Sequence, residues 1–221
     1  MATHETIPSN KIEAKAKRIV EDAIDSCPNL KAYFNENDRT PSWDGEIFVY
    51  KNGAQKKEDL YGTIPVQIKS RTVTTFSLGK CSYPLEVADL RNYLHKFGTI
   101  VFLVEINTKN ECRLYYAQLL PVHLHKQIDL LRTNQKKRNI EFNYMPEKRY
   151  NSFRFICLSF IDNQKRQAGR TVISLEEIEE LEEIQVQITT EPDKDKDYAD
   201  CLLENDVCFY GRRKTIKTLA L

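Results

Sequence analysis

Hydrophobic and polar positions recur with two different periods along the first 130 residues of the chain. Between Asn10 and Ser26, apolar residues return every three to four positions, which predicts an amphipathic helix. A second helix is expected from Tyr83 to Phe97, where Gly98 stops it, and a short one after Pro121. Alternating or continuous apolar runs predict strands. These strands are Trp43–Tyr50, Thr63–Ser70, Val73–Leu78, Thr99–Ile106 and Arg113–Gln118.

The order of these elements predicts an α/β fold with a mixed central sheet flanked by helices. Beyond Leu131 the pattern weakens, so we expect a core over residues 1–131 and a C-terminal α+β extension over residues 132–221, packed on the core or on a partner. The segments expected in the extension are a strand at Ile140–Tyr144, an acidic helix at Ser174–Glu183, and strands at Ile184–Ile188 and Val207–Tyr210. Asn151–Phe160 is apolar, but its pattern does not decide between helix and strand.

Composition narrows the class of protein but leaves its partner open. The 221 residues are 41% hydrophobic and 29% charged, which suits a globular chain with a buried core. The net charge of +1 neither demands nor excludes a nucleic-acid partner, because a neutral chain can carry a local basic patch. The six cysteines lack metal-finger spacing and suit buried thiols of a reducing compartment. Residues 1–10 have no apolar signal core and no run approaches the ~20 apolar residues that cross a bilayer, so we expect a cytoplasmic protein without membrane contact.

Two short strings place polar, metal-capable side chains on strand-like runs. The first contains Asp44, and the second contains Gln67 and Lys69 around Ile68. Gln67 and Lys69 are two residues apart on a strand, so their side chains point to the same face. A hard cation such as Mg²⁺ would take oxygen from the Asp44 carboxylate, the Gln67 amide and the Ile68 carbonyl. Lys69 could stabilise negative charge developing on a phosphate.

This arrangement resembles the PD-(D/E)xK nuclease superfamily, and most closely the Gln-x-Lys branch of Mrr-type restriction enzymes and bacterial defence nucleases. The matching residues are Asp44, Gln67 and Lys69 within about residues 10–120. Gln67 stands where most members have a second acid, and Trp43 replaces the proline of the family signature. The family also tends to place a Glu on the first helix, for which Glu13 is the candidate.

The resemblance implies a restriction-endonuclease-like core and an endonuclease that hydrolyses DNA phosphodiester bonds with Mg²⁺ or Mn²⁺. It implies Asp44, Gln67, Lys69 and Glu13 as catalytic residues, with Asp44, Gln67, Ile68 and Glu13 around the metal. The expected role is that of an effector in bacterial defence, acting alone, as a homo-oligomer or within a larger assembly. Two alternatives remain: a nuclease-fold module without activity that binds nucleic acid, and an assembly domain that docks through residues 132–221.

Simpler structural interpretations compete with each of these assignments. Asp44-Gly45 would also suit a turn, and Gln67 and Lys69 would also suit the solvent face of an edge strand. Asn10 and Glu13 have the spacing of a helix capping box.

Other polar residues carry weaker functional hypotheses. Glu46 lies two residues after Asp44, on the same face of the expected strand, and would assist it. Glu105 lies in an apolar strand, where a carboxylate needs a partner. The histidines His95, His123 and His125 suit the surface rather than a metal site. Basic and aromatic residues mix around 136–138 and 148–150, which would suit nucleic-acid contacts or a solvated face above core aromatics.

Overall fold

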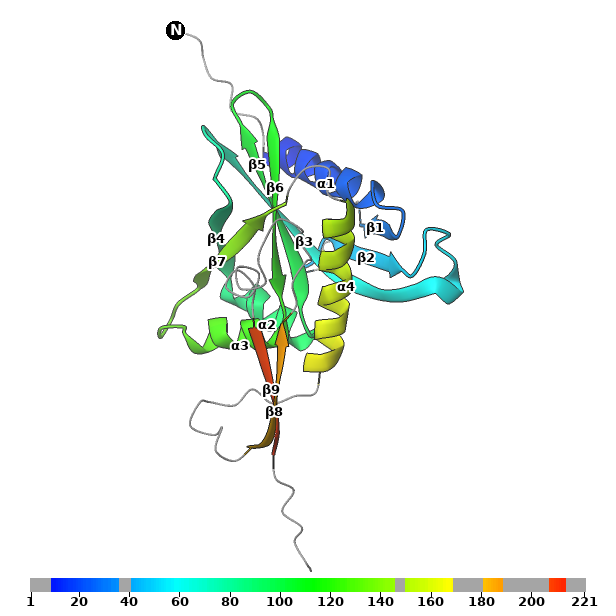
Figure 1. The fold of residues 1–221 in the computed structure, drawn as a ribbon. Helices are drawn as coiled ribbons and strands as arrows, with labels where there is room; N and C mark the ends of the chain where they lie inside the picture. Colours follow the sequence, from blue (N-terminus) through cyan, green and yellow to red (C-terminus); the bar gives the residue numbers. More distant parts are fainter. Residues whose placement is uncertain (1–8, 36–40, 146–149, 169–180, 189–206, 214–221) are drawn as a thin grey trace, which may run out of the picture. The chain divides into compact units, whose positions relative to one another are not determined.

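A seven-stranded mixed sheet forms the centre of the larger part of the molecule in this computed structural model (Figure 1). The structure describes residues 9–35, 41–145, 150–168, 181–188 and 207–213. The elements, in chain order, are α1 (Ser9–Asp25), β1 (Leu30–Phe34), β2 (Gly45–Tyr50), the 3-10 helix η1 (Lys57–Asp59), β3 (Leu60–Val73), β4 (Lys80–Glu86), α2 (Val87–His95), β5 (Thr99–Asn107), β6 (Cys112–Leu119), α3 (Pro121–Asp129), β7 (Lys137–Tyr144), α4 (Tyr150–Gln167), β8 (Leu181–Ile188) and β9 (Val207–Arg213).

The strand order in this sheet is β1-β2-β3-β5-β6-β7-β4. Neighbouring strands are antiparallel except β3 and β5, which run parallel and are connected through β4 and α2. A parallel pair needs such a long connection, because a tight turn can only reverse the chain. The predicted α/β class, with a mixed central sheet and flanking helices, is confirmed.

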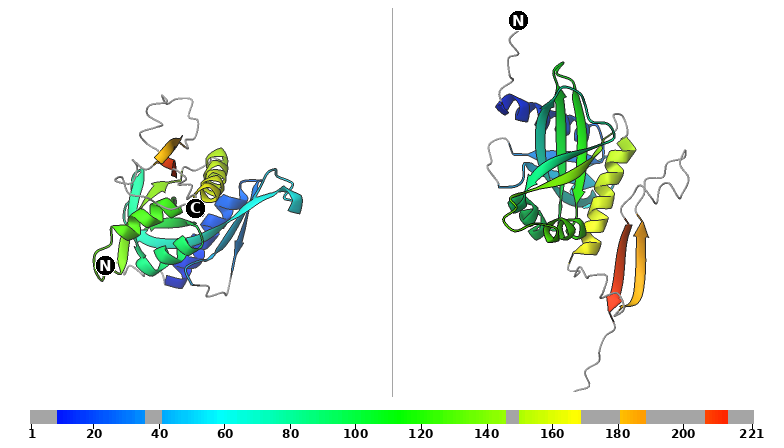
Figure 2. Two further views of the ribbon diagram at one scale, coloured as in Figure 1. Left: turned by 90° about the horizontal axis from the view of Figure 1, so that it is seen from below. Right: turned by 90° about the vertical axis from the view of Figure 1, so that its left-hand side faces the viewer.

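Helices pack beside the sheet (Figure 2), and one apolar cluster lies on each of its two faces. On the first face, α1 and α4 pack on side chains such as Ile47, Val66 and Phe102. On the second face, α2, α3 and the β4–β7 pair pack on Val101 and Leu103. Because alternate side chains of a strand point to opposite faces, Gln67 and Lys69 lie on the second face, opposite to Val66.

Two local predictions differ from the structure, and one strand carried no prediction. The strand β1 occupies residues that carried no prediction, and residues 74–78, expected within a strand, are a connection after β3. The expected start of a helix at Tyr83 is also wrong, because Lys80–Glu86 pairs with β7 and α2 begins only at Val87. Pro84 is tolerated there since β4 lies at the edge of the sheet.

The chain divides into two compact units, residues 1–169 and 170–221, rather than after Leu131. The expected boundary fails because β7 pairs with both β4 and β6, and because α4 packs into the first cluster. The apolar stretch Asn151–Phe160, whose secondary structure the sequence pattern did not decide, lies within α4.

In the second unit, β8 and β9 form an antiparallel pair. Most of the predicted acidic helix at Ser174–Glu183 falls outside the described residues, and its last three positions belong to strand β8. Within the described part of the chain, no helix is long and apolar enough to cross a membrane.

Candidate functional site

The pairing of β2 with β3 brings Asp44 opposite Gln67. In the antiparallel register Gly45 faces Val66, and the Asp44 amide donates a hydrogen bond of 2.8 Å to the Val66 carbonyl. Asp44, the residue just before β2, therefore makes the hydrogen bond at the end of the β2–β3 ladder. The carboxylate extends from the point where the two strands separate.

The Asp44 carboxylate continues the ladder with its side chain. Its Oδ2 accepts a hydrogen bond of 2.6 Å from the Ile68 amide and another from the Gln67 side-chain nitrogen Nε2. The amide and carbonyl of one strand residue point to the same side, so the Ile68 carbonyl lies at the same opening. Gln67 Nε2 also reaches that carbonyl, at 3.3 Å. Asp44, Gln67 and Ile68 thus lie together at this end of the ladder.

Two neighbouring elements hold Asp44 in place. A side chain at Gly45 would put its Cβ 2.2 Å from the Tyr33 carbonyl oxygen, so only glycine lets β1 approach this closely. On the other side, the Ser42 hydroxyl donates to Asp89 on α2 at 2.6 Å and accepts from Asn92 at 2.9 Å. Strand β1 and helix α2 therefore fix the backbone on both sides of the carboxylate.

The Asp44 carboxyl group is electrostatically unfavourable in its charged form. Burial raises the pKa of Asp44 above its ordinary value, and the charge of Glu13 adds to this effect. The Ile68 amide and the charges of Lys69 and Lys17 oppose it without cancelling it. A carboxyl group with a raised pKa is one whose charge a bound cation would stabilise.

Lys17 is a member of this cluster that the sequence analysis missed. Its Nζ donates a hydrogen bond of 2.6 Å to the Asn35 carbonyl, and the Asn35 amide donates to the Asp44 carbonyl at 3.1 Å. Lys17 follows Glu13 by one helical turn, so the two share a face of α1. This spacing is the sequence feature that could have suggested Lys17 as a site residue. It points to the site only because the chain after β1, a strand that carried no prediction, brings Asn35 to Asp44.

The candidates Glu13 and Lys69 are less firmly placed than Asp44. Glu13 is exposed on α1, and its charge acts on Asp44. The capping-box interpretation of Glu13 weakens, because α1 begins at Ser9 and Asn10 lies inside the helix. Lys69 is partly exposed on the same strand face as Gln67, and its charge favours the ionised form of Asp44.

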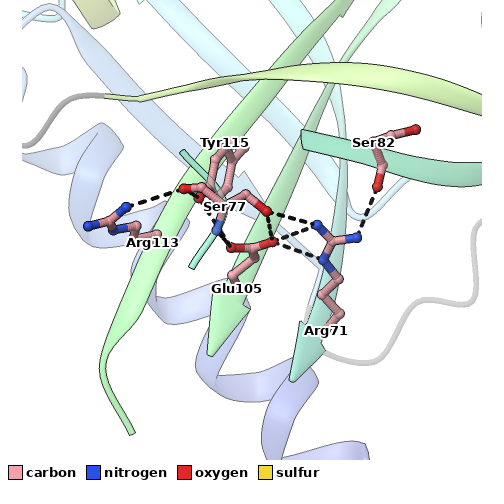
Figure 3. A network of polar contacts seen from close by, with 6 residues as sticks. All are labelled: Arg71, Ser77, Ser82, Glu105, Arg113 and Tyr115. Carbon is pink, nitrogen blue, oxygen red and sulfur yellow. Dashed lines mark hydrogen bonds and ion pairs between the residues drawn. The ribbon is translucent and has the colours of Figure 1, made fainter. Parts of the chain in front are cut away.

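Glu105 belongs to a separate network at the far end of β3 (Figure 3). It is fully buried and forms an ion pair of 2.5 Å with Arg71. Its carboxylate also accepts from the Ser77 amide at 2.9 Å, the Ser77 hydroxyl at 2.8 Å and the Tyr115 hydroxyl at 3.1 Å. Burial alone would raise the pKa of Glu105, but the hydrogen bonds from Ser77 and Arg71 and the charge of Arg71 outweigh it and lower that pKa. Glu105 therefore anchors the connection after β3.

The remaining polar candidates lie away from Asp44 or carry simpler roles. Glu46 is exposed on β2. His123 and His125 lie on α3, the short helix expected after Pro121, and His95 is exposed at the end of α2.

The two basic and aromatic segments differ in how much of them the structure describes. Lys137 pairs with Glu86 at 3.1 Å, and Arg138 donates to Gln127 at 2.9 Å. The aromatic rings of Phe142 and Phe153 belong to the two apolar clusters. Lys148 and Arg149 fall outside the described residues.

The oxygen atoms around Asp44 fit only a sparse site for a hard cation. Among the described residues, no group of three or more His, Cys, Asp or Glu side chains gathers in a way that could hold a metal. The Asp44 carboxylate and the Ile68 carbonyl are suitable ligands, whereas Gln67 turns its nitrogen, not its oxygen, toward Asp44. Rotation of this amide by half a turn would exchange the two atoms. The residues thus fit a divalent cation that keeps most of its ligands as water or substrate oxygen.

Comparison with known proteins gives little further guidance. No protein-family model matches the chain, and no curated protein does. Among solved structures, Hjc from Archaeoglobus fulgidus, a Holliday junction resolvase from an archaeal hyperthermophile, matches with a TM-score of 0.30 and 11% sequence identity. The match covers 58% of this chain and 82% of that one. A likeness at this level supports no inference about chemistry.

Proposed function

We propose that the protein is a metal-dependent nuclease that hydrolyses phosphodiester bonds of DNA, with Asp44 at its centre. The observation that supports this best is the position of the Asp44 carboxylate at the end of the β2–β3 ladder, beside the Ile68 carbonyl. Its raised pKa supports the same proposal. A half-buried carboxylate whose charged form is destabilised, and which lies beside a backbone carbonyl, is suited to binding a cation.

Some of these residues would bind the cation, and others would contact the substrate. Asp44 and the Ile68 carbonyl would hold Mg²⁺ or Mn²⁺, with Gln67 after rotation of its amide and with Glu13 through water. Such a cation, when bound, would activate water and neutralise charge on the phosphate. Lys69 would orient the attacking water and stabilise negative charge on the phosphate, and Lys17 would contact a neighbouring phosphate.

The wider role that we propose is that of a cytoplasmic effector in bacterial defence against foreign DNA. The motivation is the Gln-x-Lys pattern at Gln67 and Lys69, which resembles the corresponding motif of restriction and defence nucleases. Assembly as a homo-oligomer, or with other proteins through residues 132–221, would be a way to control such an enzyme.

Cleavage of labelled DNA by the purified full chain tests the catalytic proposal. We expect Mg²⁺-dependent cleavage that Asp44→Asn and Lys69→Met each reduce by more than about a hundredfold. The matched control is Glu46→Gln, which neutralises an exposed carboxylate two residues along the same strand. Full activity of Asp44→Asn, or equal loss in Glu46→Gln, would contradict the assignment.

A second candidate function is nucleic-acid binding without turnover. It is favoured by one contact, since the Gln67 nitrogen already donates to the Asp44 oxygen that a cation would need. This alternative predicts DNA binding that is unchanged by Mg²⁺ and no cleavage under any divalent cation. Metal-dependent cleavage that is lost in Asp44→Asn would exclude it.

A further inference from the structure

An open strip of sheet surface continues from the Asp44 site across β2 to the edge strand β1. The cross-strand pairs Lys31 with Phe48 and Tyr33 with Glu46 lie on the second face of the sheet, the face of Gln67. The alternate positions of both strands point into the first apolar cluster instead. In the second apolar cluster, α2 and α3 pack on side chains of β5 and β6, and no described residue of β1 or β2 belongs to that cluster.

An aromatic pair, with Tyr33 exposed and Phe48 half-buried, occupies this strip. The ring centroids of Tyr33 and Phe48 are 4.4 Å apart at an interplanar angle of 60°. Tyr33 is 46% exposed, so its ring has apolar area left to pack against a ligand. The Lys31 ammonium lies 5.3 Å from the centre of the Tyr33 ring. The strip therefore offers an exposed aromatic ring and a positive charge at the same point.

The strip adjoins the candidate site rather than a remote part of the domain. Tyr33 stands opposite Glu46, which is two residues from Asp44, so the two positions are separated by about 7 Å along the strands. Lys17 contacts the end of β1 through the Asn35 carbonyl, on the Asp44 side of Tyr33. A ligand bound at Asp44 that extends along β1 would meet Tyr33 next.

We propose that this strip, formed by Lys31, Tyr33 and Phe48, binds an unpaired nucleotide of a single-stranded nucleic acid whose phosphate enters the Asp44 site. The inference rests on the proposed function and adds to it the strandedness of the substrate. An unpaired base stacks on the Tyr33 ring, while Lys31 swings from the ring to a phosphate. In a duplex the faces of the bases are already stacked on each other, so the ring has nothing to bind.

Charge and area both favour a nucleic-acid strand over a protein partner. The amino groups of Lys31 and Lys69 belong to side chains on the face of the strip and complement a polyanion, whereas Glu46 is an exposed carboxylate on the same face. A stable protein interface buries roughly 800 Å² on each side around an apolar centre. One aromatic pair between charges of opposite sign does not provide such a centre.

The experiment measures binding of fluorescein-labelled strands to the full chain in EDTA, where no cleavage occurs. The probes are single-stranded DNA, single-stranded RNA of the same sequence and a DNA duplex. We expect Tyr33→Ser to weaken single-strand binding about five- to twentyfold and Tyr33→Phe to leave it unchanged, because stacking needs the ring and not the hydroxyl. Duplex binding should not respond to either substitution. The matched control is Phe97→Ser, which removes a 49% exposed ring after α2 and should not change binding.

Equal weakening for single strands and duplex, or none with Tyr33→Ser, would overturn the inference. If sedimentation shows a dimer that dissociates in Tyr33→Ser, the strip would be an interface with a second copy of the chain. That result would also overturn the inference. Because the assay contains no metal, its outcome does not depend on cleavage. A failure of the proposed hydrolysis therefore appears separately, as an absence of Asp44-dependent turnover.

Discussion

Asp44 and Glu105 are two carboxylates on the same face of the sheet, yet their surroundings have opposite effects on their charge. Burial disfavours the ionised form of both. Glu105 receives donors from Ser77, Arg71 and Tyr115, and its pKa is lowered. Asp44 receives the Ile68 amide and the Gln67 side chain, which do not compensate for burial, and its pKa is raised. A satisfied buried charge serves the fold, whereas an unsatisfied one is available for a ligand.

Removing the partner of Glu105 should have the largest effect on stability. We expect Arg71→Ala to lower the free energy of unfolding by about 3 kcal/mol, because it leaves a buried carboxylate without its counter-charge. Urea unfolding measures this value. Lys80→Ala is the control, since it breaks the exposed ion pair with Glu141 and should cost under about 1 kcal/mol. Equal losses in the two variants would mean that Glu105 gains little from Arg71.

Removing the charge of Asp44 should raise the free energy of unfolding, the opposite of the effect of Arg71→Ala. Asp44→Asn keeps an oxygen that can accept from the Ile68 amide and the Gln67 side chain, but it removes a charge that burial disfavours. We therefore expect a gain of about 1 kcal/mol in metal-free protein at pH 7, seen as a rise of roughly 2–4 °C in Tm. Glu46→Gln should change Tm by less. A clear loss of stability in Asp44→Asn would mean that its charge supports the fold as that of Glu105 does.

The smallest effect concerns the lysines of α1. Lys17 and Lys15 both donate to a backbone carbonyl, of Asn35 and Asn110 respectively, but only Lys17 lies beside Asp44. We expect Lys17→Gln to weaken metal-free DNA binding about threefold and to reduce its salt dependence by about one phosphate contact. Lys15→Gln should change neither in fluorescence anisotropy. If both variants lose affinity equally, α1 acts through its overall charge and not through a specific contact.

The sequence predicted the parts of the fold that depend on local patterns. The period of apolar residues in α1 and the continuous apolar run of β5 each identify the element almost to its ends. Strand β1 carried no prediction because its five residues alternate too briefly to stand out beside a polar loop. The position of β7 in the main sheet depends on pairing with β4, a strand far away in the sequence that itself resembled a helix start.

The candidate site was predictable in its residue types but not in its contacts. The spacing of Gln67 and Lys69 places both on one face of β3, and that face is the one of Asp44. The nitrogen of Gln67 facing Asp44 and the approach of Lys17 through Asn35 depend on how β1 and α1 dock. The partners of Glu105 were likewise not predictable. Arg71 faces it through the parallel register of β3 and β5, and Ser77 reaches it from the connection after β3.

The measurement that tests the contrast most directly is a pH titration of the side-chain carboxyl resonances of Asp44 and Glu105 by NMR, with and without Mg²⁺. Without metal, Asp44 should titrate above its ordinary value of 3.8 and Glu105 below its ordinary value of 4.5. The two groups should then affect stability with opposite signs. Ionised Glu105 adds stability that is lost as pH falls from about 4.5 toward its lowered pKa, while ionised Asp44 costs stability that is regained as pH falls through its raised pKa.

With Mg²⁺, the pKa of Asp44 should fall and that of Glu105 should stay the same. An Asp44 that titrates at or below 3.8 without metal, or that does not respond to Mg²⁺, would contradict the account.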